Sequence, residues 1–133
     1  MSDLFADTSF FIAFLNPRDE HHSTAVEILS KHRASVVTTS WVLVELGNYL
    51  AASPARRLFV PFVQDLRKDS RFVLVSANDS LVERGMRFYK RREDKRWSLT
   101  DCISFIVMRD RGLTVAITAD HHFEQAGFEV LIK

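Results

Sequence analysis

The chain has 133 residues and a formal net charge of +1, with 47% hydrophobic and 26% charged residues. This length favours one domain, and the composition excludes collagen-like, coiled-coil and intrinsically disordered classes. The balanced charge predicts no global attraction to nucleic acid or to a membrane, so any recognition must be local. We therefore predict a single domain over residues 1–133.

No secretory signal or membrane-spanning segment is expected from the sequence. The apolar run 10–15 follows two acids, Asp3 and Asp7, where a secretory signal has basic residues. No apolar run approaches the roughly 18 residues that a membrane-spanning helix needs. The single cysteine, Cys102, excludes an internal disulfide and suits a reducing compartment. These features predict a cytoplasmic protein with no membrane partner.

Short β-branched runs alternate along the chain with longer segments of helical periodicity. Strands are predicted at 4–6, 35–39, 72–76, 115–118 and 129–132, and helices at 8–15, 20–33, 40–52, 54–68, 78–94, 98–111 and 121–126. Strands that are separated by helices pair in parallel through crossover connections. The pattern thus predicts an α/β sandwich in which helices cover a mostly parallel sheet.

Glycine and proline residues indicate where the predicted helices end or are interrupted. Gly112 and Gly127 each follow a predicted helix and are expected to be its C-terminal cap. Pro61 lies inside the segment 54–68 and is expected to kink or interrupt the helix there. The apolar residues 58–63 around it are expected in the core, with a dimer face as the alternative.

Four carboxylates stand out by position. Asp7 directly follows the first predicted strand, and Asp120 follows the strand 115–118 by two residues. Because sites in parallel sheets form at the carboxyl ends of the strands, these two acids are expected to face one cleft. Glu45 lies in the first or second helical turn after the strand 35–39, and Asp101 lies near the start of an apolar helix. All four are therefore candidates for one site.

Each acid also has a structural explanation. Asp7 and Asp120 could be N-caps, and Ser98 with Asp101 fits a capping box. Glu45 would need an arginine or lysine partner. Four acids at one sheet edge, without a basic partner in their own segments, would repel one another unless cations lay between them. We therefore predict a site for Mg²⁺ or Mn²⁺, which prefer carboxylate and water ligands.

These segments, in this order, resemble the PIN-domain ribonucleases and, within them, the VapC-like toxins of type II toxin–antitoxin systems. The resemblance covers essentially the whole chain and rests on residues 4–9, Val44-Glu45-Leu46, residues 98–102 and residues 118–123 followed by Gly127. It implies a three-layer α/β/α fold, an acidic pocket for Mg²⁺ or Mn²⁺ and hydrolysis of RNA phosphodiester bonds. It also implies a homodimer and inhibition by a cognate antitoxin.

The resemblance assigns roles to the acids. The resemblance implies metal ligation most firmly for Asp7 and Asp101. Together with Glu45 and Asp120 they form a quartet of acids. In this family a polar residue often assists the acids, and Thr8, Ser9 and Thr118 match that residue only loosely. The family varies at His121-His122, which receive no role, and adjacent histidines are expected to point in different directions on a helix. A metal-bound water would then be the nucleophile.

A basic stretch is the candidate substrate contact. Residues 84–96 contain seven lysines and arginines against two acids. This stretch predicts contacts to RNA phosphates at Arg91 and Arg92, with Tyr89 and Trp97 available for base stacking. The alternative is a solvated helix end whose cations interact with the helix dipole.

Two other functions remain open on the sequence. One is a phosphoryl-transfer domain with an aspartyl nucleophile, although Asp7-Thr8-Ser9 lacks a second acid two residues on. The other is a PIN-like module that binds RNA or protein and has lost catalysis. The presence of all four acids favours the nuclease.

Overall fold

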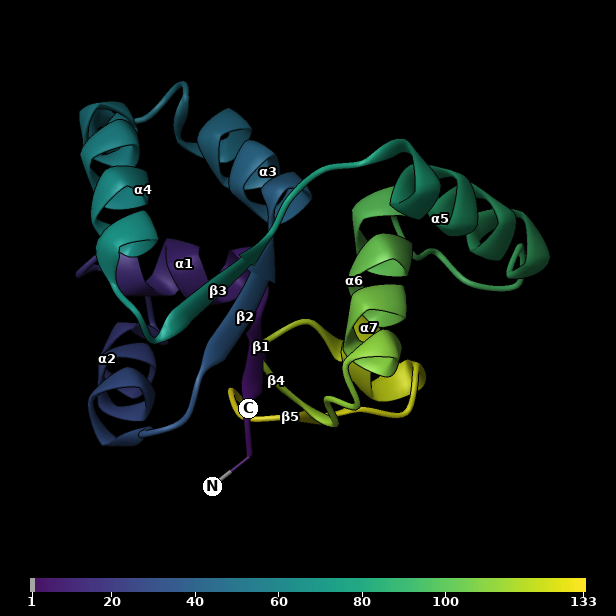
Figure 1. Ribbon diagram of the computed structural model, residues 1–133. Coiled ribbons are helices and arrows are strands. Elements are labelled where there is room, and N and C mark those ends of the chain that lie inside the picture. Colours follow the sequence, from purple (N-terminus) through teal and green to yellow (C-terminus); the bar gives the residue numbers. More distant parts are fainter. Residues whose placement is uncertain (1) are drawn as a thin grey trace.

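A five-stranded parallel sheet lies at the centre of the computed structural model, which describes residues 2–133 (Figure 1). The strand order is β3-β2-β1-β4-β5, and all four neighbouring pairs are parallel. The strands are β1 (Leu4–Ala6), β2 (Val36–Thr39), β3 (Phe72–Val75), β4 (Val115–Ile117) and β5 (Glu129–Val130). The predicted α/β class is confirmed.

Helices cover both faces of this sheet. They are α1 (Thr8–Leu15), α2 (His22–Lys31), α3 (Ser40–Leu50), the 3₁₀ helix η1 (Pro54–Leu58), α4 (Phe59–Lys68), α5 (Asp79–Arg91), α6 (Leu99–Asp110) and α7 (His121–Gln125). Figure 1 shows α1 to α4 on one side of the sheet and α5 to α7 on the other, which makes three layers. Within residues 2–133, no helix has both the length and the apolar character needed to cross a membrane.

The strand order changes direction at β1. The chain moves from β1 outward through β2 to β3, then returns to place β4 and β5 on the other side of β1. In sheets of this kind the functional crevice lies at such a switch point, outside the carboxyl ends of the strands. Ala6 and Ile117 end β1 and β4 and are paired in register. Asp7 and Thr118, which follow them, therefore start from the same point of the sheet.

Aromatic side chains fill the space between the sheet and both helical layers. On the α5–α7 side, Trp97 packs edge-on against Phe105 with 5.0 Å between ring centroids, and its Nε1 donates to Gln125 Oε1 at 2.9 Å. Only 3% of Trp97 is exposed. The predicted stacking role of Trp97 is therefore wrong, because this large apolar ring is buried between α5, α6 and α7 rather than left on the basic surface.

Both predicted glycine caps are confirmed. Gly112 and Gly127 adopt φ values of 68° and 97°, in the left-handed region that glycine enters without steric cost. The residue after each glycine donates back into the helix: Leu113 N reaches Met108 O at 2.8 Å after α6, and Phe128 N bonds in the same way after α7. These contacts satisfy carbonyl groups that the helix ends would otherwise leave unpaired.

The segment around Pro61 is interrupted, as predicted, but upstream of the proline. The chain forms η1 and then begins α4 at Phe59, so Pro61 is the third residue of α4, where no intrahelical N–H bond is needed. The core expectation for this segment is partly wrong, since Leu58 and Val60 are 43% and 58% exposed. The other predicted element ends lie within three residues of those observed.

Candidate active site

Three of the four predicted acids come together at the switch point. Asp7 directly follows β1, Asp101 lies in the first turn of α6, and Asp120 immediately precedes α7. Asp7 and Asp101 are buried, with 4% and 7% of their surfaces exposed, whereas Asp120 is half-buried. The charges of Asp101 and Asp120 both act on Asp7, so the three carboxylates form one electrostatic unit.

Asp7 has the most perturbed carboxyl group of the site. Burial, reinforced by the charges of Asp101 and Asp120, raises its pKa to about 7, against the opposing hydrogen bonds from the Thr8 amide and the Thr118 hydroxyl. Asp7 makes no side-chain capping bond to α1, so the N-cap explanation does not hold for it. Burying a carboxylate lowers the stability of the fold unless a cation compensates it. The buried carboxyl group of Asp7 therefore indicates a functional role rather than a stabilising one.

Asp101 combines a structural contact with a place in the site. Ser98 Oγ accepts from Asp101 N at 3.0 Å, and Ser98 N donates to Asp101 Oδ2 at 3.1 Å, which completes the capping box suggested by the sequence. Burial raises the pKa of Asp101, and the charge of Asp120 raises it further. The capping box therefore fixes the carboxylate in the site and is no alternative to a functional role.

Asp120 is an N-cap as well. Its Oδ1 accepts from His122 N at 2.9 Å, which satisfies one of the free amides at the start of α7. Its own backbone N donates to Thr118 Oγ1 at 2.9 Å. Both bonds hold this residue against the end of β4.

A hydroxyl pair supports the acids. Thr118 Oγ1 donates to Asp7 Oδ2 at 3.0 Å and lies 2.9 Å from Ser9 Oγ. Because the single Thr118 proton is directed to Asp7, Ser9 must donate to Thr118, and Ser9 Oγ in turn accepts from Ala119 N at 3.1 Å. Of the three polar residues considered from the sequence, Thr118 thus bonds to Asp7 through its side chain, Thr8 does so through its amide, and Ser9 acts through Thr118.

His122 is a site residue that the sequence analysis missed. Its Nδ1 lies 3.1 Å from Asp101 Oδ2 and 3.4 Å from Asp120 Oδ1. The rings of His121 and His122 lie with centroids 4.6 Å apart, so they are closer than the expectation of different directions implies, but only His122 contacts Asp101. The spacing Asp-x-His at a helix start could have revealed this contact, because an N-capping carboxylate reaches the backbone two residues on.

Glu45 lies apart from this unit. It is half-buried in the second turn of α3, the helix that leaves the same sheet edge after β2. Within residues 2–133 its side chain makes no hydrogen bond or ion pair, and the charges that raise the pKa of Asp7 are those of Asp101 and Asp120. Its membership of the quartet therefore remains a prediction.

The donor set fits a divalent cation. Asp7 and Asp101 are buried carboxylates, and among the described residues neither has a lysine or arginine partner. Their pKa values are raised by burial and by neighbouring negative charge, which a cation between them would relieve. Carboxylate oxygens are the ligands that Mg²⁺ and Mn²⁺ prefer.

Comparison with known proteins identifies the family. The model of the PIN domain matches residues 4–129. The chain belongs to the PIN-domain family. It is 30% identical, over 94% of its length and 95% of the relative's, to a protein of Mycobacterium tuberculosis named 23S rRNA-specific endonuclease VapC20. The crystal structure of VapC20, described as a toxin that cleaves the sarcin–ricin loop, superposes with a TM-score of 0.85 at 29% identity and covers 96% of each chain.

More distant structures share the fold of this PIN domain. VapBC2 of Rickettsia felis, bound to a DNA fragment from its promoter, matches with a TM-score of 0.67 at 14% identity over 97% of both chains. DNA-bound VapBC of Salmonella typhimurium matches with a TM-score of 0.65 at 17% identity, over 98% of this chain and 97% of the other.

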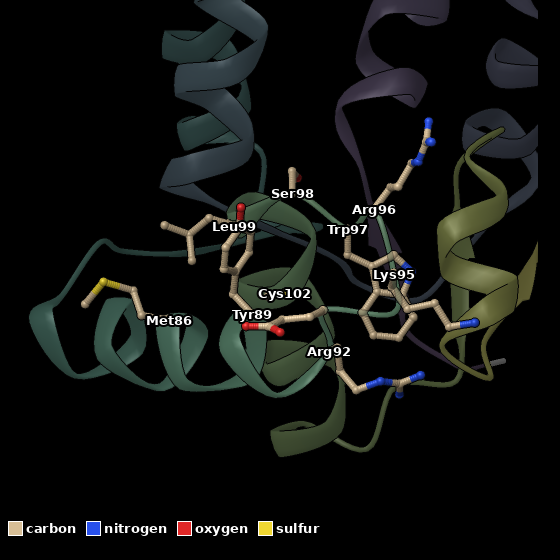
Figure 2. Close-up of a pocket in the computed structure, with 10 residues that line it drawn as sticks. Met86, Tyr89, Arg92, Lys95, Arg96, Trp97, Ser98, Leu99 and Cys102 are labelled. Atoms are coloured by element: carbon tan, nitrogen blue, oxygen red, sulfur yellow. The ribbon is translucent and has the colours of Figure 1, made fainter.

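A pocket of about 850 Å³ with basic side chains in its lining lies between α5 and the start of α6 (Figure 2). Its lining includes Tyr89, Lys95, Arg96 and Ser98. Ser98 connects pocket and acids, since it lines the pocket while its backbone N donates to Asp101. In Figure 2 Tyr89 rises from α5 beside Leu99, and more than half of the Tyr89 surface is exposed.

The two arginines predicted to contact RNA are held in place by other side chains. Arg91 lies over the ring of Phe88 at 5.5 Å. Arg92 donates two hydrogen bonds to Asp94, at 2.9 and 3.0 Å, and lies 4.9 Å from the Trp97 ring. The charge of Arg92 is partly balanced by Asp94.

Proposed function

We propose that this PIN domain is a metal-dependent endoribonuclease that hydrolyses RNA phosphodiester bonds, and that it is the toxin of a toxin–antitoxin pair. The observation that carries the proposal is the cluster of Asp7, Asp101 and Asp120, two of them buried, without a lysine or arginine partner among the described residues. The 30% identity with a 23S rRNA-specific endonuclease along nearly the whole chain supports the same reaction.

In this proposal the acidic quartet is Asp7, Glu45, Asp101 and Asp120, and Asp7 and Asp101 hold the ion, Mg²⁺ or Mn²⁺. The ion would supply a bound water of lowered pKa and a positive charge beside the phosphate. Thr118 orients the Asp7 carboxylate, and the capping box with Ser98 orients that of Asp101. The Asp120 carboxylate is fixed by its hydrogen bond from the backbone N of His122 at the start of α7, and it adds a further negative charge beside the ion.

RNA would reach these acids across the basic pocket. The support for this path is Ser98, which lines the pocket and whose backbone N donates to Asp101, so a nucleotide bound in the pocket would be connected to the site through this residue. Arg91 and Arg92 are the proposed phosphate contacts, together with Lys95. The exposed ring of Tyr89 offers a face on which a base can stack.

Protein partners form the second part of the proposal. We expect a cognate antitoxin, because the structural neighbours include VapBC assemblies. We also expect a homodimer through the apolar face of α3, η1 and α4, where Val44, Tyr49, Leu58 and Val60 are all more than 40% exposed. Light scattering should report a dimer, and replacing Val44 and Val60 by Glu should produce monomers. A dimer that persists in this variant would contradict that interface.

Cleavage of mixed RNAs, with cut ends mapped by sequencing, tests the main proposal. The purified chain should cut RNA with Mg²⁺ or Mn²⁺, the Asp7→Asn variant should not, and Asp65→Asn should behave as wild type. Asp65 is an exposed aspartate on α4 and is the matched control. RNA binding without cleavage would favour the catalytically idle module. Acid-stable phosphate on Asp7 is not expected, and a trapped aspartyl phosphate would favour the phosphoryl-transfer alternative.

A further inference from the structure

We propose that His122 is a ligand of the bound metal ion, through Nδ1, together with Asp101 and Asp120. This inference rests on the proposed metal pocket and goes beyond the acidic quartet, since it adds a nitrogen donor. Its consequence is a site that favours Mn²⁺ or a later transition-metal ion over Mg²⁺.

The first support is the separation of the donor atoms. His122 Nδ1 lies 3.1 Å from Asp101 Oδ2 and 3.4 Å from Asp120 Oδ1. Two ligands that each lie about 2.1 Å from one ion are about 3.0 Å apart at octahedral angles and about 3.4 Å apart at tetrahedral angles. His122 Nδ1 thus stands from each of these two carboxylate oxygens at the spacing of ligands that share an ion.

The second support is how His122 is positioned. Its backbone N donates to Asp120 Oδ1 at 2.9 Å, which fixes the first turn of α7 against that carboxylate. Its side chain is 22% exposed, whereas that of the adjacent His121 is 72% exposed. His121 Nδ1 approaches Asp120 Oδ1 only to 3.9 Å, and no contact with Asp101 is found in the described chain. His122 therefore faces the acids, and His121 lies at the rim.

The third support is the chemistry of the donor set. Asp120, His121 and His122 can each offer a ligand atom within 4.8 Å of the other two, and Asp101 adjoins this group through its contact with His122. Mg²⁺ prefers oxygen donors and gives up its water reluctantly, whereas imidazole suits transition-metal ions. When an ion binds, Nδ1 must be unprotonated, with the ring proton on Nε2, and the hydrogen bond between His122 and Asp101 is replaced by two bonds to the ion.

A simpler account is that His122 only pairs with Asp101. In that case an ion bound at the carboxylates would have oxygen ligands alone, and His122 would not distinguish Mn²⁺ from Mg²⁺. The two accounts therefore differ in what surrounds a bound Mn²⁺ ion, which can be measured directly.

Pulsed electron paramagnetic resonance of the tag-free chain loaded with Mn²⁺ tests the inference. The wild-type protein should show coupling between Mn²⁺ and a histidine nitrogen, verified by its change on labelling histidine with ¹⁵N. The coupling should disappear in His122→Asn and persist in His121→Asn, the matched control on the same helix. By calorimetry, His122→Asn should weaken Mn²⁺ binding about tenfold or more and Mg²⁺ binding much less.

The outcomes separate this inference from the proposed function. Mn²⁺ that binds without histidine coupling, or coupling lost only in His121→Asn, overturns the ligand role of His122 and leaves the acidic pocket standing. Failure of the wild-type chain to bind Mn²⁺ at all overturns both. The wild-type spectrum shows whether a histidine nitrogen binds the ion, and coupling that persists in His121→Asn but is lost in His122→Asn assigns it; coupling retained in His122→Asn also overturns the inference.

Discussion

Thr118 Oγ1 donates a 3.0 Å hydrogen bond to Asp7 Oδ2 and thereby joins two residues that are 111 positions apart in the sequence. Each residue follows the end of one of two paired strands, β1 and β4. The same hydroxyl accepts the backbone N–H of Asp120. One side chain thus positions two of the three clustered acids.

Replacing Thr118 by Val should remove this support. The variant leaves Asp7 without its hydroxyl donor and the Asp120 amide without its acceptor, in a place that is almost fully buried. Unpaired buried groups of this kind cost on the order of 1–3 kcal/mol each. We expect a lower free energy of unfolding in urea and weaker Mn²⁺ binding by calorimetry.

Thr118→Ser is the control, because it keeps the hydroxyl and removes only a methyl group. It should retain most of the Mn²⁺ affinity that Thr118→Val loses. Equal losses in the two variants would show that the methyl packing, and not the hydrogen bond to Asp7, matters at this position.

Removing one acid should separate activity from stability. Asp7→Asn and Asp101→Asn each delete a negative ligand, so we expect RNA cleavage to fall below detection while the fold is kept. In the metal-free protein, the loss of repulsion and of a buried charge should leave the melting temperature unchanged or raise it, as is common where function opposes stability. Unchanged turnover in both variants would refute the assignment of the site.

The raised pKa of Asp7 predicts a pH dependence of the metal-free protein. Burial raises this pKa from its ordinary value of 3.8 to about 7. Between these values the folded chain holds a proton that the unfolded chain has released. The free energy of unfolding therefore falls as the pH rises from about 4 to about 7, by an amount on the order of a few kcal/mol.

Denaturation in EDTA at pH 5 and pH 8 measures this effect. Comparison with Asp7→Asn isolates it from other titrating groups, since the variant lacks only this carboxyl group. Asp7→Asn should gain stability relative to wild type as the pH rises. Parallel pH curves for the two proteins would show that Asp7 titrates normally.

The sequence was sufficient for the fold and for the gathering of three acids at one sheet edge, because both depend on local signals; the role of these acids stays a prediction. Asp7 and Asp120 were found from strand ends, and Asp101 from a helix start, and a parallel sheet brings such positions to one edge. Glu45 was placed by the same argument, but its side chain makes no contact with the other acids in the described structure, because a second-turn residue lies farther from the strand end.

Other features depend on packing that the sequence does not reveal. Trp97 follows seven basic residues and so suggested a surface position, yet it fills the space between α5 and α6. His121 and His122 are identical in type and adjacent, and only the structure distinguishes the exposed ring from the one against Asp101.

Charge reversal at Arg91 and Arg92 tests the basic surface. Replacing both by Glu should weaken RNA binding and lower the slope of log affinity against log salt by about 1 to 2, because each lost phosphate contact removes roughly 0.7 of the slope for a single strand. Cleavage of a very short substrate should be largely retained. Fluorescence anisotropy at several salt concentrations gives the slope.

Lys31 at the end of α2 and Lys68 at the end of α4 provide a control for total charge. Reversing these two exposed lysines makes the same change in net charge on the opposite helical layer. Equal effects of the two double variants would show that RNA binding responds to net charge alone. If charge reversal at Arg91 and Arg92 has no effect on RNA binding, residues 84–96 are a solvated surface or an antitoxin contact.

The chemistry of the cut ends separates the metal-ion mechanism from acid–base catalysis by histidine. If His121 and His122 acted as general acid and base, the 2′-hydroxyl of the RNA could attack and leave cyclic phosphate ends without a divalent ion. Their adjacent rings make this alternative concrete. With a metal-activated water as nucleophile, the products should carry a 5′-phosphate and a 3′-hydroxyl, and EDTA should stop the reaction until Mg²⁺ or Mn²⁺ is restored. Cyclic phosphate products that persist in EDTA would overturn the mechanism while leaving the fold assignment intact.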